Sequence, residues 1–303
     1  MGQRNRIPSC GKPQENTCRR YGERLYFPDF ERRIFSPPPP IGECMINYDE
    51  IHSFQNLYKA HLAARKGKRD KTDVIRFEMN LAENLYELQQ ALLDKTYHPK
   101  GYKHFYVYDP KLRSIYAPSY ADRVVQHCLC DNILTPVLEK HLIYDNAACR
   151  VGKGTHFSIY RLSGFMRDFY GKYKDGGFFL KCDVRKYFDS IDHDVLKEKL
   201  KKVFGSDDIF VLLCRIIDSY ELARGKGLPL GNQTSQWFAL LYLDEADRLI
   251  KEKLRIKYYV RYMDDFILLH HSKEYLHECL FRIRELFSGS LKLELRACKK
   301  IIV

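Results

Sequence analysis

The stretch YVRYMDDFILLH, residues 259–270, places two neighbouring aspartates in the middle of an apolar and aromatic run. The residues on both sides are β-prone, so the pattern predicts a hairpin with Asp264 and Asp265 at its tip. Aspartate is also common in ordinary turns, where glycine or asparagine usually follows it, but here the next residue is Phe266. A rigid apolar hairpin that presents two carboxylates suits a divalent metal ion, which prefers oxygen ligands.

A second acidic segment, FFLKCDVRKYFDSIDHDVLKEKL at residues 178–200, is predicted to run from a strand into a helix. Asp183 ends the strand, whereas Asp189 and Asp192 have the ordinary places of turn and helix-cap residues. If this strand lies beside the hairpin, Asp183 joins the two hairpin aspartates in a site for two Mg²⁺ ions. Two such ions about 4 Å apart can activate a 3′-hydroxyl and stabilise a leaving pyrophosphate.

A glycine loop, GKGLPLGNQTSQ at residues 225–236, lies between these two segments. Gly231 permits close approach of another backbone, and the helix predicted beyond it favours contact with a phosphate or a base. Such a loop is weak evidence by itself. The order of the three segments is more informative: a strand aspartate, a glycine loop before a helix, and a hairpin with two aspartates.

The composition favours a polyanionic partner. The 303 residues carry a formal net charge of +12, which suits nucleic acid or an acidic membrane surface, although a merely basic protein is the alternative. No apolar run approaches the roughly 18 residues that span a bilayer, and the first residues have no apolar signal-peptide core. None of the ten cysteines forms a C-x-x-C pair, so we expect reduced thiols in the core and a cytoplasmic protein without membrane contact.

The chain divides into an unusual beginning and a regular remainder. Residues 1–46, with SPPPP at 36–40, predict a poorly ordered, proline-rich extension. Beyond it, periodicity predicts helices at about 51–69, 81–92, 120–141, 158–173, 192–204, 206–220, 234–253 and 272–287. Short β-like runs fall at about 102–109, 113–118, 176–184 and 291–297.

Taken together, YMDD at 262–265, FLKCDVRKYFDSID at 179–192 and the glycine loop resemble the motifs of reverse transcriptases. The resemblance runs from about Tyr48 to the end of the chain. It implies an α+β right-hand polymerase, with helical fingers and a short β-hairpin at 47–175. It also implies a palm at 176–303, in which helices cover a ferredoxin-like sheet. The sequence stops at KKIIV, where relatives continue into a thumb, so the thumb is expected to be missing.

The resemblance also assigns roles to individual residues. Asp183, Asp264 and Asp265 match the catalytic carboxylates that hold two Mg²⁺ ions, with Mn²⁺ as an alternative. Phe188 matches the aromatic gate that excludes a ribose 2′-hydroxyl, and Arg113 matches the fingers arginine that grips the incoming triphosphate. The remaining positions are Leu230, Gly231 and Gln236 for nucleotide binding, Lys300 or its neighbour Lys299 for protonating pyrophosphate, and Arg123, Lys66, Arg69, Tyr262 and Met263 for nucleic-acid contact. Arg123 is equally suited to a structural role, and Lys66 and Arg69 to a solvated helix end.

One departure indicates a subtype. Many reverse transcriptases have Q-G-x-x-x-S-P in the glycine loop, whereas this chain has LGNQTSQ at 230–236, with Leu230 for the glutamine and Gln236 for the proline. That pattern, with DRVVQHCLC and ACRVGKGTH, resembles the enzymes of diversity-generating retroelements, which copy a template-repeat RNA with errors at adenines.

The implied partners are an RNA template, a DNA primer, dNTPs and a small helical accessory protein. The alternatives are a defence-associated or retron-type reverse transcriptase, and a non-catalytic RNA-binding protein with a vestigial polymerase fold.

Overall fold

The computed structural model describes residues 47–108, 110–174, 176–296 and 299–302, the last of these without their side chains; the predicted N-terminal extension lies outside this range. The described part begins with four helices: α1 (Asp49–His52), α2 (Phe54–Ala64), α3 (Thr72–Met79) and α4 (Leu81–Leu93). The predicted leucine spacing in α4 is confirmed, since Leu85, Leu88 and Leu92 are buried. The single helix predicted at 51–69 is instead α1 and α2, because Ser53 between them has an extended backbone.

A two-stranded antiparallel hairpin follows, made of β1 (Tyr102–Tyr108) and β2 (Leu112–Pro118). It leads into one long helical run: α5 (Tyr120–Leu129), the π-helical turn η1 (Cys130–Leu134) and α6 (Thr135–His141). The predicted cap is present, because the Ser119 side chain accepts a hydrogen bond from the Asp122 amide. The buried Asp122 carboxylate also accepts from the Tyr97 hydroxyl at 2.8 Å, which fixes the start of the helix against the approach to β1.

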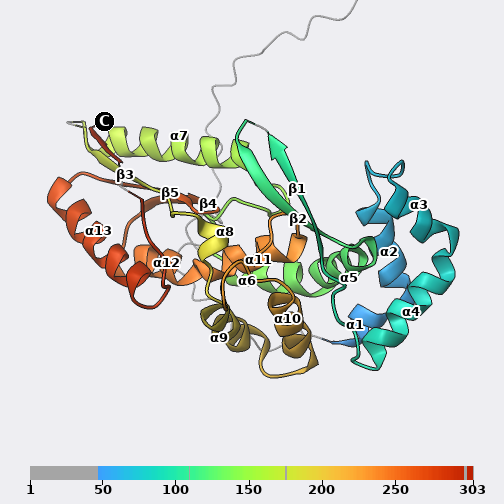
Figure 1. The fold of residues 1–303 in the computed structure, drawn as a ribbon. Coiled ribbons are helices and arrows are strands. Elements are labelled where there is room, and N and C mark those ends of the chain that lie inside the picture. The colour runs from blue at the N-terminus through green and yellow to red at the C-terminus, as the bar shows by residue number, and fades with distance from the viewer. Residues whose placement is uncertain (1–46, 109, 175, 297–298, 303) are drawn as a thin grey trace, which may run out of the picture. The chain divides into compact units, whose positions relative to one another are not determined.

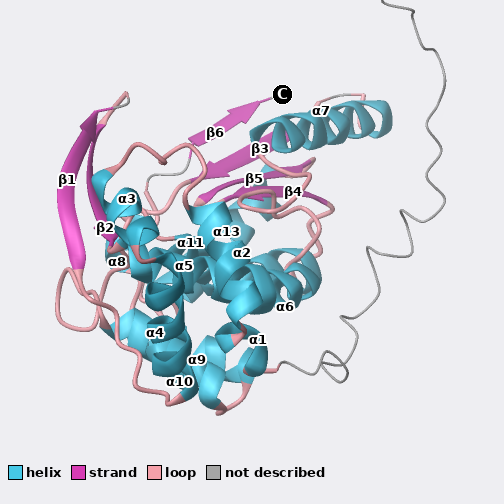
Figure 2. Ribbon diagram, turned by 90° about the vertical axis from the view of Figure 1, so that its right-hand side faces the viewer, coloured by secondary structure: helices cyan, strands magenta, loops and turns pink. Residues whose placement is uncertain are grey.

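The main sheet has four antiparallel strands in the order β4-β5-β3-β6 (Figures 1 and 2). The strands are β3 (Phe178–Cys182), β4 (Tyr258–Tyr262), β5 (Asp265–His270) and β6 (Lys299–Ile302). Between β3 and β4 lie α8 (Tyr187–Ser190), α9 (His193–Phe204), α10 (Asp208–Asp218), α11 (Gln233–Tyr242), α12 (Asp244–Arg248) and η2 (Leu249–Lys253). Helix α13 (Lys273–Ser288) joins β5 to β6. The β-α-β-β-α-β order is ferredoxin-like, so the predicted fold is confirmed.

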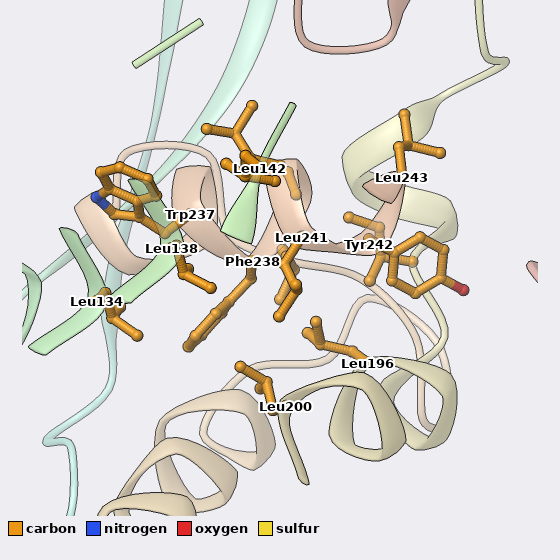
Figure 3. Packing of buried hydrophobic residues seen from close by; sticks show 14 of the residues in the cluster. Leu134, Leu138, Leu142, Leu196, Leu200, Trp237, Phe238, Leu241, Tyr242 and Leu243 are labelled. Carbon is orange, nitrogen blue, oxygen red and sulfur yellow. The ribbon is translucent and has the colours of Figure 1, made fainter. Parts of the chain in front are cut away.

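Helices cover both faces of this sheet. Helix α7 (Thr155–Lys172) lies on one face (Figure 1). Its Phe165 and Phe169 pack against Tyr258 of β4. On the other face α13 contacts β3 and β5. Helix α11 is at the centre of the larger core, and Figure 3 shows its apolar side chains packed against leucines of η1, α6 and α9. Because α11 is buried almost all round, the glycine loop that precedes it is held firmly in place.

The strand predicted at 291–297 is wrong. Alternating apolar residues there suggested a strand, but the amides of Leu291 and Leu293 bond back to Leu286 and Phe287 of α13, and Lys292 has a positive φ of 49°. The edge strand is β6, a few residues later. Within the residues that the structure describes, no helix is long and apolar enough to cross a membrane. The division at residue 175 into fingers and palm stays a prediction.

Candidate active site

The YMDD segment forms the predicted tight hairpin turn between β4 and β5. Tyr262 pairs with Asp265 across the ladder, which leaves Met263 and Asp264 as the two turn residues. Met263 has φ +54°, a left-handed conformation that is unfavourable for a residue with a side chain. The surrounding structure must therefore hold the turn in place.

A buried ion pair supplies this support. Arg261 of β4 and Asp247 of α12 are 1% and 0% exposed, and Arg261 Nη2 lies 2.6 Å from Asp247 Oδ2. Arg261 Nη1 donates to the Met263 carbonyl oxygen at 2.8 Å, and Nη2 also donates to the Leu240 carbonyl oxygen at 3.1 Å. Asp247 accepts a further bond from the Tyr259 hydroxyl at 2.5 Å. One guanidinium thus ties the strained turn to two helices behind the sheet.

Asp183 follows β3 directly, and the pairing of Cys182 with Phe266 brings it to the same end of the sheet as the turn. Burial raises the pKa of Asp264 to about 6, and the carboxyl of Asp183, which is within hydrogen-bonding reach, and the charge of Asp265 add to the shift. Asp183 and Asp264 are therefore brought together, as the sequence predicts. A carboxylate that is partly buried beside other carboxylates is stabilised by a bound cation.

The outer carboxylates are paired with basic side chains. Asp183 Oδ2 lies 3.1 Å from Arg296 Nη1, and Asp265 Oδ1 lies 3.6 Å from Lys181 Nζ. In this arrangement no three His, Cys, Asp or Glu side chains within the described residues are grouped closely enough to hold a metal ion. The oxygen donors still suit Mg²⁺ or Mn²⁺, provided that Asp183 and Asp265 exchange these partners for the ion.

The glycine loop lies against β2. The Tyr116 amide donates to the Leu230 carbonyl oxygen at 3.0 Å, and a Cβ atom on Gly231 would lie 3.2 Å from Ile115 Cγ2. The close approach predicted for Gly231 is therefore present. Arg113 lies two residues before Ile115, so the pleat places it on the same face of the hairpin, where it is exposed.

Phe188 and Gln236, two other residues predicted to contact the nucleotide, lie in α8 and α11. Phe188 is half-buried on α8, its ring packs edge-on against Tyr187, and its carbonyl oxygen accepts from the Leu228 amide at 2.8 Å. Gln236 is exposed on α11, and its Oε1 lies 3.1 Å from Cys149 Sγ. Phe188 is thus bonded to the glycine loop through the backbone.

The predicted nucleic-acid contacts are dispersed. Lys66 and Arg69 lie in the turn between α2 and α3, and both are exposed. Arg123 is on α5, with its guanidinium 5.9 Å from the centre of the Tyr120 ring. Tyr262 is exposed beside the catalytic turn, and Met263 packs against the core. Lys300 of β6 pairs with Leu180 of β3, but the Lys300 side chain lies outside the described part of the chain.

Several residues of the site were missed by the sequence reasoning. A charged residue inside the apolar strand YYVRY was a usable signal for Arg261. Its partner Asp247 lies in an ordinary acidic stretch of helix, where no sequence signal distinguishes it. Lys181 alternates outward from β3, and Arg296 follows the last described helix, so their approach to the aspartates depends on tertiary structure.

Residues 101–302, more than half of the chain, match the family described as reverse transcriptase (RNA-dependent DNA polymerase). The chain belongs to this reverse transcriptase family. Among curated proteins, YkfC of Escherichia coli (strain K12) is 23% identical over 262 residues, which cover 73% of this chain and 68% of YkfC.

A solved telomerase shares the fold of this reverse transcriptase domain. The telomerase of Candida albicans, solved with a TWJ fragment of telomeric RNA, aligns with a TM-score of 0.51 at 15% identity, over 68% of this chain and 42% of that chain. An apo telomerase of Candida tropicalis, truncated from its C-terminal domain, aligns with a TM-score of 0.49 at 16% identity, over 67% of this chain and 50% of that chain. The chain therefore spans half or less of these telomerase chains.

Proposed function

We propose that this reverse transcriptase chain is an RNA-directed DNA polymerase that adds nucleotides by two-metal-ion catalysis. The observation that carries the proposal is the meeting of Asp183 and Asp264 at one end of the ferredoxin-like sheet. Membership of the family gives the reaction class, and the paired carboxylates give it a site. Its substrates are dNTPs, an RNA template and a DNA primer.

Asp183, Asp264 and Asp265 would hold the two ions. When bound, Mg²⁺ at this site supplies the positive charge that activates a primer 3′-hydroxyl and stabilises the leaving pyrophosphate. The chain's own residues position the substrates. Arg113 binds the triphosphate through its planar fork, and the Phe188 ring excludes a ribose 2′-hydroxyl.

Extension of oligo(dT) on poly(rA), with Mg²⁺ or Mn²⁺, tests the activity. We expect dTMP incorporation by the wild type and a loss of about a hundredfold or more in Asp264→Ala, because carboxylate-bound metal contributes several kcal/mol. Asp189→Ala is the matched control, since this exposed aspartate lies on the same segment as Asp183 but is not among the carboxylates that raise the pKa of Asp264. Incorporation that is absent in the wild type, or equal in Asp264→Ala, removes the proposal.

The LGNQTSQ loop supports a finer proposal, that the enzyme makes mutagenic cDNA from a template-repeat RNA of a diversity-generating retroelement. Leu230 has no side-chain hydrogen bond to offer near the nascent base pair, so geometric discrimination against mispairs is weakened. Leu230→Gln is expected to lower misincorporation opposite template adenine. An unchanged error spectrum in sequenced primer-extension products counts against this subtype, as does a gene neighbourhood without a template and variable repeat pair.

A further inference from the structure

One face of the β1–β2 hairpin is built mainly from aromatic rings. Strand side chains alternate between faces, and the register pairs each residue with a neighbour on the same side. The face opposite to Arg113 and Ile115 is here called the aromatic face, and its members are Tyr102, His104, Tyr106, Tyr108, Leu112, Ser114, Tyr116 and Pro118. Ile115 contacts Gly231 of the glycine loop from the other face, whereas the aromatic face touches that loop only at its base, where Asn232 bonds to Tyr102.

Apart from Tyr108, which lies two residues beyond Tyr106 at the outer end of β1, the rings of the aromatic face are linked in a row. His104 stacks on Tyr116 with centroids 4.5 Å apart and planes 19° apart, and Tyr106 packs edge-on against His104 at 4.8 Å. At the base of the hairpin Tyr116 and Tyr102 both pack edge-on against Tyr220, which follows α10. Such pairs fix the rings relative to one another.

Hydrogen bonds anchor this row to the rest of the domain. The Tyr102 hydroxyl lies 2.8 Å from Ser219 Oγ and accepts from Asn232 Nδ2 at 3.3 Å. The outer end of the aromatic face is by contrast open to solvent, with Tyr106 66% and Tyr108 78% exposed. In Figure 2 the hairpin stands at the edge of the described unit, away from the four-stranded sheet. The surface is therefore held rigidly at one end and is available at the other.

We propose that the aromatic face binds an unpaired stretch of nucleic acid by stacking its bases on Tyr106 and Tyr108. Large side chains that are exposed next to one another, unlike those scattered singly over a surface, mark an interaction site. The surface offers ring faces with polar hydroxyl tips, and Leu112 is its single branched aliphatic residue. This composition suits bases better than an apolar protein segment. The +12 charge of the chain attracts the phosphates, and Lys111 lies next to the face in the turn.

This inference does not depend on DNA synthesis. Stacking requires unpaired bases, because a base inside a duplex has its faces covered by its neighbours. It does not use the 2′-hydroxyl, so single-stranded RNA and DNA of the same sequence are both expected to bind. A blunt duplex of that sequence is expected not to use the aromatic face.

Fluorescence anisotropy with a labelled single-stranded RNA of about 12 nucleotides tests the proposal, on the whole chain without dNTPs. Tyr108→Ala is expected to weaken binding by about fivefold or more, whereas Tyr108→Phe stays within about twofold, because the ring is what stacks. Leu112→Ala is the matched control: Leu112 is opposite Tyr108 in the ladder and is 65% exposed, but it has no ring. Its affinity is expected to stay within about twofold of wild type. Tyr108→Thr repeats the test with a residue that preserves β propensity.

Two further measurements separate stacking from other modes of binding. The dependence of affinity on salt is expected to be unchanged in Tyr108→Ala, because the lost contact is not to a phosphate. RNA that contains 5-iodouridine is expected to form a photo-adduct with Tyr106 or Tyr108, located by mass spectrometry. The proposal is overturned if the wild type does not bind the RNA, if neither Tyr108→Ala nor Tyr108→Thr weakens binding, or if Leu112→Ala weakens it equally. The last outcome would show a general apolar contact, such as a protein segment.

Discussion

Arg261 and Asp247 form an ion pair buried directly behind the turn of Met263 and Asp264, with 2.6 Å between guanidinium Nη2 and carboxylate Oδ2. The same guanidinium donates to the carbonyl oxygen of Met263, the residue with the strained backbone. Burial raises the pKa of Asp247, and the charge of Arg261 opposes this shift, so the carboxylate depends on the guanidinium to stay ionised inside the protein. The pair therefore links the stability of the domain to the position of Asp264.

Arg261 both neutralises Asp247 and holds the Met263 carbonyl oxygen, and two variants are needed to separate these contributions. Arg261→Met leaves Asp247 buried without its partner, and we expect a loss of about 3–5 kcal/mol in the free energy of unfolding, measured by urea denaturation. The double variant Arg261→Met/Asp247→Leu removes both charges and is expected to recover most of that loss. It still lacks the bond to Met263, so its rate of nucleotide addition is expected to stay well below that of the wild type. A double variant with wild-type kcat would show that the pair does not position the turn.

The raised pKa of Asp264 predicts that this residue destabilises the protein when no cation is bound. The pKa of Asp264 in the folded chain, about 6, lies above its ordinary value of 3.8. The stability that the protonated carboxyl contributes is therefore fully present below pH 3.8 and is lost as the pH rises through 6. In EDTA, Asp264→Asn is therefore expected to be more stable than the wild type above pH 6. The gain is about 1–2 kcal/mol after allowance for partial exposure, and it should shrink towards zero near pH 4. Urea unfolding across this pH range measures it, and a gain independent of pH would contradict the assignment.

Phe188 is expected to decide between deoxyribose and ribose substrates. Phe188→Val removes the ring and is expected to raise the relative kcat/KM for a ribonucleotide by about tenfold to a hundredfold, with little change for the matching dNTP. The measurement is single-nucleotide extension with paired dNTP and rNTP titrations. Equal discrimination in variant and wild type would mean that another side chain provides the gate.

Gly231 is expected to tolerate no side chain. Gly231→Ala forces a residue with φ +122° to carry a Cβ atom 3.4 Å from the Tyr116 carbonyl oxygen, besides its contact with Ile115. We expect a loss of about 1–3 kcal/mol in stability. Gly154→Ala is the control, because Gly154 has a similarly large positive φ of +138° but no atom lies within 4 Å of its Cβ position. Thermal unfolding of the two variants compares them, and equal losses would show that backbone strain alone is responsible.

The sequence predicted the parts of this molecule that depend on local chemistry. Alternation and turn composition located the catalytic hairpin, and the strand that ends at Asp183 was placed correctly beside it. Prediction was wrong where a local pattern was overridden by tertiary contacts. The alternating residues 291–295 look like a strand, yet two of their amides bond to α13, and only Leu295 forms a bridge, to Val184.

The partners of the charged site residues were beyond the reach of sequence reasoning. Asp247, Lys181 and Arg296 meet their counterions only because helix α12, strand β3 and the segment after α13 are brought to one place. Nothing in the local composition around them distinguishes these residues from ordinary surface charges. A single sequence offers no other signal for such distant pairs.

The strand order of the main sheet has a consequence for the timing of folding. The hairpin that carries Asp264 closes between neighbouring residues, but Cys182 reaches its partner Phe266 only after all the helices between β3 and β4 have been made. Contacts so distant along the chain are slow to form, because a long loop must close first. On the ribosome, we expect the two carboxylates to meet only after the chain has emerged beyond β5, so the acidic cluster should be among the last features of the domain to mature.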